Sequence, residues 1–188
     1  MKHLDQVLIE AKRAMRKDGD LPLTAVGFDV RGRGFKIWTQ VRDDKDKERF
    51  SMAIAGNMMV HQAVEYYVVF TGWMVMLDKA EEEVKTRPSN DPRRQETLIV
   101  YGESQQEKVA KVYLVERDQG ERFLGLKART DLDEMVANNS QMRFSGMLGD
   151  PKNKHTNDDR ERMRMMLKPM PDIFKIYGPE PLINPALN

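Results

Sequence analysis

The sequence predicts an α+β fold, in which a mainly antiparallel sheet carries two helices packed on one face, followed by a C-terminal helix and an extended proline-rich arm. Apolar residues recur at helical intervals in two segments, and further segments show the alternating or continuous apolar pattern of strands. Short connections between these strands favour antiparallel neighbours. With 188 residues, of which 40% are hydrophobic, the chain can form one core domain with an appendage.

The first predicted elements are a helix and a hairpin. The helix is expected over residues 2–17, because one of its faces would collect apolar residues spaced by three and four: Leu4, Val7, Leu8, Ala11, Ala14 and Met15. Residues 24–30 and 35–41 are then expected to form two strands, joined by the turn Arg31-Gly-Arg-Gly34.

A second helix is expected over residues 45–62, where Asp43–Asp44 can cap the N-terminus. Gly56 lies inside this helix and costs about 1 kcal/mol relative to alanine. The inner face of the helix would carry Phe50, Ala53, Ile54 and Met58. The remaining strands are expected over residues 66–77, 96–103, 109–117 and 121–127.

The composition changes after the predicted core domain, residues 1–148, and residues 149–188 are expected to form a C-terminal helix and arm. The helix is predicted over residues 156–168, with Thr156 or Asn157 as its cap. The prolines beyond it exclude regular structure, yet the segment is too apolar for a free tail. We expect this part to contact another subunit of a homo-oligomer, with a lid folded on its own domain as the alternative. The residues expected at the contact are Met163, Met166, Leu167, Phe174, Ile176, Tyr177, Leu182 and Ile183.

Composition also excludes several classes of site. The 31 basic and 30 acidic side chains nearly cancel, so nucleic-acid binding would need a local patch. Without cysteine there can be no disulfide, thiolate nucleophile or Cys-ligated zinc, and with three scattered histidines we expect no metal site and no cofactor. No apolar run approaches the roughly 20 residues of a membrane span, and no signal peptide is recognisable, so we expect a cytoplasmic protein without membrane contact.

The main candidate for anion binding is the polar loop of residues 85–96, which lies between two apolar strands. Two prolines restrict its backbone and would hold Arg87, Arg93 and Arg94 in a limited set of positions. Guanidinium groups match phosphates and carboxylates in bidentate geometry, so these arginines could clamp an anion. The alternative is that they pair with carboxylates of the loop and its flanks.

Two further basic features are weaker candidates. Arg31 and Arg33 at the hairpin tip could press a flexible backbone against a phosphate, although an ordinary hairpin turn explains the same residues. Arg160, Arg164 and Lys168 form a basic row along the 156–168 helix, which could touch an anionic partner.

Trp38 and Trp73 are the candidates for aromatic contacts. Trp73 lies in an apolar strand and is expected to be packed, whereas Trp38 alternates with apolar residues and is the better candidate for an exposed ring. His61 ends an apolar helix without a second ligand at metal-binding spacing, so we expect no metal role for it.

An apolar strand ends in Trp73-Met74, and the next loop has the form Arg-Pro-Ser-x-x-Pro-x-Arg-x-Glu, matched by Arg87-Pro88-Ser89, Pro92, Arg94 and Glu96. In this pattern, and in the order of elements over roughly residues 2–148, the chain resembles a family of small uncharacterised α+β proteins encoded by phages and prophage-bearing bacteria. The resemblance implies a phage or prophage origin. It implies no known activity, so no catalytic residue is carried over.

We therefore expect a non-enzymatic, phage-type accessory protein of the host cytoplasm that binds an anionic ligand as a homo-oligomer. Its ligand would be a nucleotide, a nucleic-acid segment or the surface of a host protein. The alternative is a structural or assembly protein of a phage particle, tied to its copies by the arm and located in the virion. A nucleotide-processing enzyme ranks third, because no spacing singles out a catalytic pair among the 30 acidic residues.

Overall fold

The computed structural model describes residues 1–41, 43–76, 88–139, 144–148, 155–168 and 175–177. Its helices are α1 (Leu4–Asp18), α2 (Asp44–His61), α3 (Thr130–Ala137) and α4 (Asn157–Leu167), with a 3₁₀ turn η1 (Pro88–Asn90). Its strands are β1 (Leu23–Asp29), β2 (Gly34–Thr39), β3 (Ala63–Met74), β4 (Gln95–Ser104), β5 (Lys108–Arg117), β6 (Phe123–Ala128) and β7 (Lys175–Tyr177).

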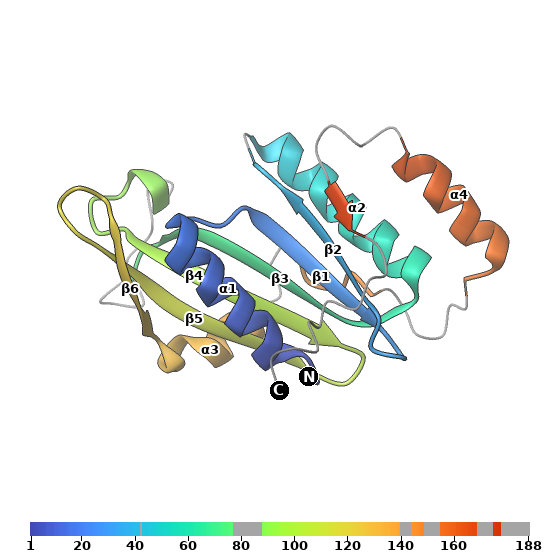
Figure 1. Cartoon of the computed structure of the whole chain (residues 1–188), viewed down its shortest axis with the longest axis horizontal. Helices are drawn as coiled ribbons and strands as arrows, with labels where there is room; N and C mark the ends of the chain where they lie inside the picture. The colour runs from blue at the N-terminus through green and yellow to red at the C-terminus, as the bar shows by residue number, and fades with distance from the viewer. Residues whose placement is uncertain (42, 77–87, 140–143, 149–154, 169–174, 178–188) are drawn as a thin grey trace.

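The strands form one sheet in the order β6-β5-β4-β3-β1-β2-β7, and every neighbouring pair is antiparallel. Helix α1 lies on one face of this sheet, and α2 lies on the other (Figure 1). The predicted α+β class and antiparallel sheet are confirmed. The expectation that both helices share one face is wrong.

The central strands show why both faces are covered. Successive side chains of a strand point to opposite faces, and in β3 both sets are apolar. Tyr66 and Val68 pack with α2 and α3, whereas Tyr67 and Val69 pack with α1. All four are buried. A strand that is apolar on both sides needs cover on both sides, so the continuous apolar run of β3 is explained by a helix on each face.

Helix α2 begins where the sequence predicts. The carboxylate of Asp43 accepts a hydrogen bond from the backbone N–H of Asp46, which satisfies one of the free donors of the first turn. The apolar residues expected on its inner face are buried: Phe50, Ala53, Ile54 and Met58. Among the helices of the described ranges, none combines the length and apolar character that a bilayer crossing needs.

Two elements differ from the sequence prediction. Helix α3 was not predicted; it buries Leu132 and Val136, and the carboxylate of Asp133 ties it to β5 by accepting from the backbone N–H of Val112 at 3.0 Å. The prediction that no regular structure follows the 156–168 helix is wrong as well. Residues 175–177 form β7, which pairs with β2 in the register Ile37 to Ile176.

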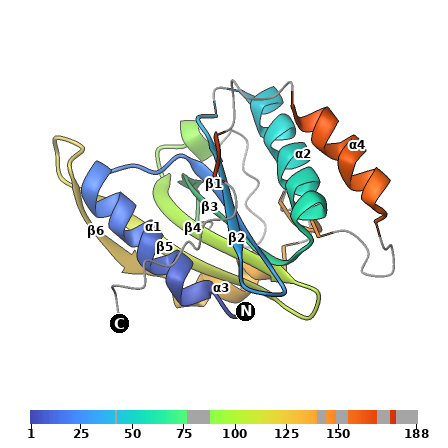
Figure 2. The same ribbon diagram turned by 45° about the vertical axis from the view of Figure 1, so that its right-hand side comes forward.

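The C-terminal helix is capped as predicted. The Thr156 hydroxyl accepts from the backbone N–H of Asp159, whose carboxylate accepts from the Thr156 N–H in return. Figure 2 shows α4 packed beside α2 of the same chain. Gly56 of α2 allows this approach, because a Cβ atom there would lie 2.9 Å from the sulfur of Met163 and 3.2 Å from a methyl carbon of Leu167.

Most of the residues expected at a subunit contact can now be placed. Met163 and Leu167 contact Gly56 within the same chain, as the alternative of a lid folded on its own domain describes. Met166 is 65% exposed. Ile176 and Tyr177 belong to β7, while Phe174, Leu182 and Ile183 lie outside the described residues. The homo-oligomer therefore stays a prediction.

Candidate anion-binding cleft

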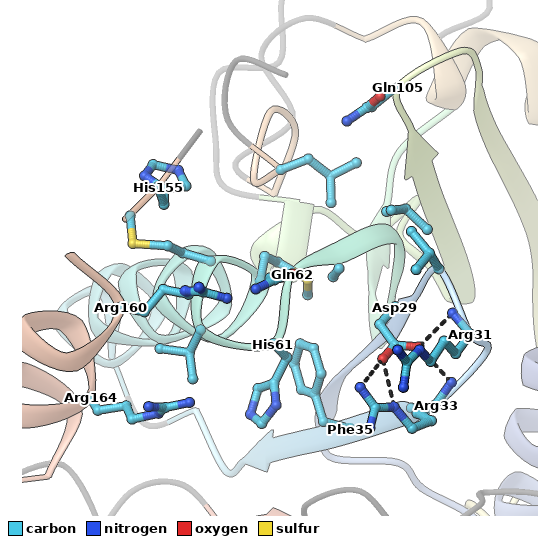
Figure 3. Close-up of a pocket in the computed structure, with 18 residues that line it drawn as sticks. Asp29, Arg31, Arg33, Phe35, His61, Gln62, Gln105, His155, Arg160 and Arg164 are labelled. Atoms are coloured by element: carbon cyan, nitrogen blue, oxygen red, sulfur yellow. Dashed lines mark hydrogen bonds and ion pairs between the residues drawn. The ribbon is translucent and has the colours of Figure 1, made fainter. Parts of the chain in front are cut away.

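A cleft of about 720 Å³ lies between the tip of the β1–β2 hairpin, the C-terminal end of α2 and helix α4 (Figure 3). Side chains from distant parts of the sequence meet there. The basic side chains and imidazoles that line it are Arg31, Arg33, His61, His155, Arg160 and Arg164. Among the lining residues that the structure describes, Asp29 supplies the one carboxylate. The cleft therefore gathers positive charge although the whole chain carries a net charge of only +1.

Asp29 shapes the hairpin tip. Its Oδ1 accepts from the backbone N–H groups of Arg31 at 2.8 Å and Arg33 at 2.9 Å, and its Oδ2 accepts from the Nε of Arg33 at 2.7 Å. Gly32 adopts the left-handed φ of 74° that closes the turn. Burial alone would raise the pKa of Asp29, but these hydrogen bonds outweigh it and hold the pKa below its usual value. The carboxylate thus stays ionised and is already engaged.

The two hairpin arginines differ in whether their guanidinium groups already have a partner. The guanidinium of Arg33 is paired with Asp29. The guanidinium of Arg31 is exposed and makes no hydrogen bond or ion pair with the part of the chain that the structure describes. Arg31 is therefore the arginine of the cleft that is most available to an incoming anion.

The pKa of His61, which lines the cleft, reflects the positive charge around it. Its ring stacks on Phe35, with 4.6 Å between the ring centres. Burial is the main cause that lowers the pKa of His61, and the positive charges of Arg164 and Arg33 lower it further against the opposing effect of Asp29. The imidazole is therefore neutral at neutral pH, and arginines from both walls of the cleft act on it.

We predict that the pKa of His61 responds to charge in the cleft. Because the folded pKa lies below the ordinary 6.5, the neutral ring is favoured, and this group's contribution to stability is lost as pH falls through 6.5 towards the folded value. Replacing Arg164 by alanine removes a positive neighbour, so the pKa should rise towards its ordinary value, and a bound anion should raise it as well. An NMR titration of the ring between about pH 5 and 8 measures this. An unchanged pKa of His61 in Arg164→Ala would contradict the conclusion that the charge of Arg164 lowers it.

Helix α4 supplies the opposite wall. Arg160 and Arg164 are one helical turn apart and both line the cleft. Their present partners are on the same helix: Arg160 contacts the side-chain oxygen of Asn157, and Arg164 donates to a carboxylate oxygen of Glu161 at 3.1 Å. Such exposed pairs stabilise a helix by only a few tenths of a kcal/mol, about 0.3–0.5. Both arginines can thus turn to a stronger acceptor at little cost.

The loop singled out by the sequence is organised by its own residues. Arg87 lies outside the described residues. Arg93 donates from both its Nε and Nη2 to the buried carboxylate of Asp91, at 3.2 and 3.1 Å. Arg94 donates to the carbonyl oxygen of Ser89 at 2.6 Å and stacks on Trp73, 4.8 Å from the ring centre. These contacts support the alternative of internal pairing, and an anion at this loop stays a prediction.

The two tryptophans are placed differently from expectation. Trp73 is 45% exposed, whereas Trp38 is half-buried, so Trp73 rather than Trp38 presents the more open ring. The reason is position along the strand. Burial in β3 declines from residue 70 onward, where the strand runs past the helices that cover its centre.

The sequence interpretation missed the roles of Asp29 and His61 in this cleft. An aspartate two residues before Arg31 is a signal of a side-chain-supported turn, and it was available in the sequence. Nothing in the sequence showed that His61 would lie against a basic cleft. Within the described ranges, no three His, Cys, Asp or Glu side chains come together as a metal site requires.

No protein-family model matches the chain, and no curated protein and no solved structure shows significant similarity to it.

Proposed function

We propose that this protein is a non-enzymatic binding module whose ligand is an anion held in the basic cleft. The observation that carries the proposal is the convergence of Arg31 and Arg33 from the hairpin with Arg160 and Arg164 from α4. Guanidinium groups bind phosphate and carboxylate groups by paired, charge-assisted hydrogen bonds. Four of them line one concave surface, where the described residues supply one carboxylate that is already engaged, so an anion is the best-fitting ligand.

The chemistry of the lining favours binding over catalysis. The described lining residues include no serine, threonine, cysteine, tyrosine or lysine that could act as a nucleophile. Asp29 is held by three hydrogen bonds of the turn, so it is poorly placed to take up a proton. The other polar side chains of the described lining are two histidines, two glutamines and four arginines, and the arginines are suited to binding a negative group.

A role in assembly is a second candidate. Met165 and Met166 lie on the outer side of α4 and are 54% and 65% exposed. Methionine is flexible and suits adaptable contacts with a partner, including another copy of the chain. In a phage setting, as the resemblance implies, the same protein would act on host molecules in the host cytoplasm or tie copies together in a particle.

The binding proposal predicts that single arginines control affinity for a simple polyanion. We expect Arg31→Ala and Arg160→Ala each to weaken the binding of tripolyphosphate about tenfold, since a hydrogen bond to a charged group contributes about 1.5 kcal/mol or more. Calorimetric titration of the purified protein at low salt measures the affinities. Thermal melts of the same variants should stay close to those of the parent protein, because Arg31 is exposed and Arg160 is only half-buried.

Arg162→Ala is the matched control. Arg162 is exposed on the same helix but does not line the cleft, so its loss should leave the affinity nearly unchanged. Equal weakening by all three substitutions would mean that tripolyphosphate responds to overall charge and that the cleft is no specific site.

A further inference from the structure

Building on the proposed function, we propose that the ligand is a chain of linked phosphate groups that bridges the two walls of the cleft and thereby holds helix α4 on the core.

The first argument is the arrangement of the arginines. Figure 3 shows Arg160 and Arg164 on the α4 side and Arg31 and Arg33 on the hairpin side, with His61 between them. The cleft volume of about 720 Å³ is in the range of small-molecule sites. A single tetrahedral anion would bind the arginines of one wall only. A ligand that engages both walls needs several negative groups in a row.

The second argument is that α4 is held on the core by few apolar contacts. None of its side chains is fully buried. Met163 and Leu167 provide the contact with Gly56, and its other described side chains are exposed or only half-buried. Burial of an apolar side chain stabilises by about 1.5–3 kcal/mol only when it is complete. The docking of α4 is therefore weak enough for a ligand to control.

The third argument is electrostatic. Docking of α4 brings Arg160 and Arg164 towards Arg31 and Arg33, and the carboxylate of Asp29 is already used by the turn. Charges separated by less than a Debye length, about 8–10 Å at moderate salt, repel one another appreciably. Arg33 and Arg164 both act on His61, so the fields of the two walls overlap. A polyanion between the walls converts this repulsion into attraction on both sides.

The lining also favours phosphate over a base or an acidic peptide. Nucleobases bind best by stacking on exposed Phe, Tyr or Trp rings, and Phe35, the one such ring among the described lining residues, is buried and stacked with His61. A phosphate chain concentrates more charge in a cleft of this size than a peptide of carboxylates does. Guanidinium forks and a neutral imidazole that can take up a proton suit such a ligand.

If the ligand bridges the walls, binding and docking must stabilise each other to the same degree. We expect amide hydrogen exchange within α4 to slow about tenfold in the full chain when tripolyphosphate is present at ten times its dissociation constant. Inorganic phosphate at the same ionic strength should leave α4 exchange unchanged. Exchange in the central strands serves as the internal reference.

Two matched pairs of substitutions at apolar residues of α4 test the same coupling between ligand binding and the docking of α4. Met163→Gln with Leu167→Gln weakens the inner contact while all arginines remain, so it should lower tripolyphosphate affinity as much as Arg160→Ala with Arg164→Ala does. Met165→Gln with Met166→Gln alters the exposed side of the same helix and should change nothing. The exchange experiment on the unmodified protein stands even if a variant folds poorly.

The outcomes separate this inference from the proposed function. Tripolyphosphate binding that depends on Arg31 but leaves α4 exchange unchanged would overturn the bridging role and keep the anion site. Absence of any Arg31-dependent binding would overturn both. ATP should bind within about threefold of tripolyphosphate, because we expect its base not to stack in the cleft. A stacked base would add about 1–3 kcal/mol, and ATP binding that much tighter would overturn the assignment of a bare phosphate chain. Hexaglutamate that binds as tightly as tripolyphosphate and slows α4 exchange equally would overturn the phosphate assignment.

Discussion

Glu103→Ala is expected to lower the free energy of unfolding by about 3–4 kcal/mol, the range for breaking a buried charged network. Oε2 of Glu103 accepts from the hydroxyl of Tyr101 at 2.8 Å and from the backbone N–H of Gly146 at 2.9 Å, and it lies 2.9 Å from the hydroxyl of Tyr66. Both tyrosine rings are fully buried. Alanine would remove the acceptor that the three groups share, leaving Tyr66 only the carbonyl oxygen of Phe144 and Tyr101 only the hydroxyl of Ser145. Chemical denaturation with a fixed m-value measures the loss.

This network also fastens the segment that precedes the C-terminal arm. The hydroxyl of Tyr66 lies 2.5 Å from the carbonyl oxygen of Phe144, whose ring packs against those of Phe50 and Phe70. Burial raises the pKa of Tyr66, and the carboxylate of Glu103 raises it further. Burial would also raise the pKa of Glu103, but the hydrogen bonds from Gly146, Tyr101 and Tyr66 lower it below its ordinary 4.5. This contribution to stability is therefore present above pH 4.5 and is lost as pH falls through the lower, folded pKa.

Glu103→Gln and Glu116→Ala are the controls. Glutamine retains an acceptor oxygen in place, so its cost should be smaller than that of alanine. Glu116 is exposed on the neighbouring strand β5, and its replacement should change stability by less than about 0.5 kcal/mol. A Glu103→Ala variant as stable as Glu116→Ala would show that the network contributes nothing.

Gly27→Ala is expected to destabilise the fold by about 3 kcal/mol, the upper part of the range for an overpacked core. Gly27 pairs across the hairpin with Phe35, whose ring lies directly over it. An added Cβ would stand 2.5 Å from two atoms of that ring and 2.8 Å from the sulfur of Met58. The ring is buried and stacked on His61, so it can yield only by giving up that contact. Denaturant unfolding at neutral pH provides the measurement.

The same substitution at Gly72 serves as the control. A Cβ there would lie 3.9 Å from its nearest neighbour, which is ordinary contact, so Gly72→Ala should be neutral or stabilise by about 0.5 kcal/mol. Adding Phe35→Leu to Gly27→Ala should recover part of the loss, because the two sites are in contact and their effects should not add. Equal stability of Gly27→Ala and Gly72→Ala would refute the close-packing account.

The local residue pattern predicted the order of the elements from α1 to β6. It failed for features that depend on which elements pack against each other. The apolar run of β3 identified a strand, but nothing in it states that α1 and α2 cover opposite faces. Helix α3 has only eight residues, so its three buried side chains, Leu132, Val136 and Ala137, give too short a pattern to recognise as helical. β7 pairs over three residues in a proline-rich segment whose composition argues against regular structure.

The candidate site shows the same limit. The sequence pointed to the arginines of the hairpin and to those of the C-terminal helix as separate features, and it gave first place to the 85–96 loop. Their meeting depends on the docking of α4 on α2 at Gly56, which in the sequence is only a residue that weakens a helix. The pairing of Arg93 with Asp91 depends on the conformation of the loop, which residue spacing alone leaves open.

The most direct test of the central claim is an NMR titration of the arginine side-chain Nε–Hε signals with tripolyphosphate. Signals of Arg31, Arg33, Arg160 and Arg164 should shift together along one saturable curve. Those of Arg93 and Arg94 should move only weakly and without saturation, because their guanidiniums are held within the loop. Saturable shifts at Arg93 and Arg94, with the four cleft arginines unmoved, would contradict the account and place the anion site on the 85–96 loop.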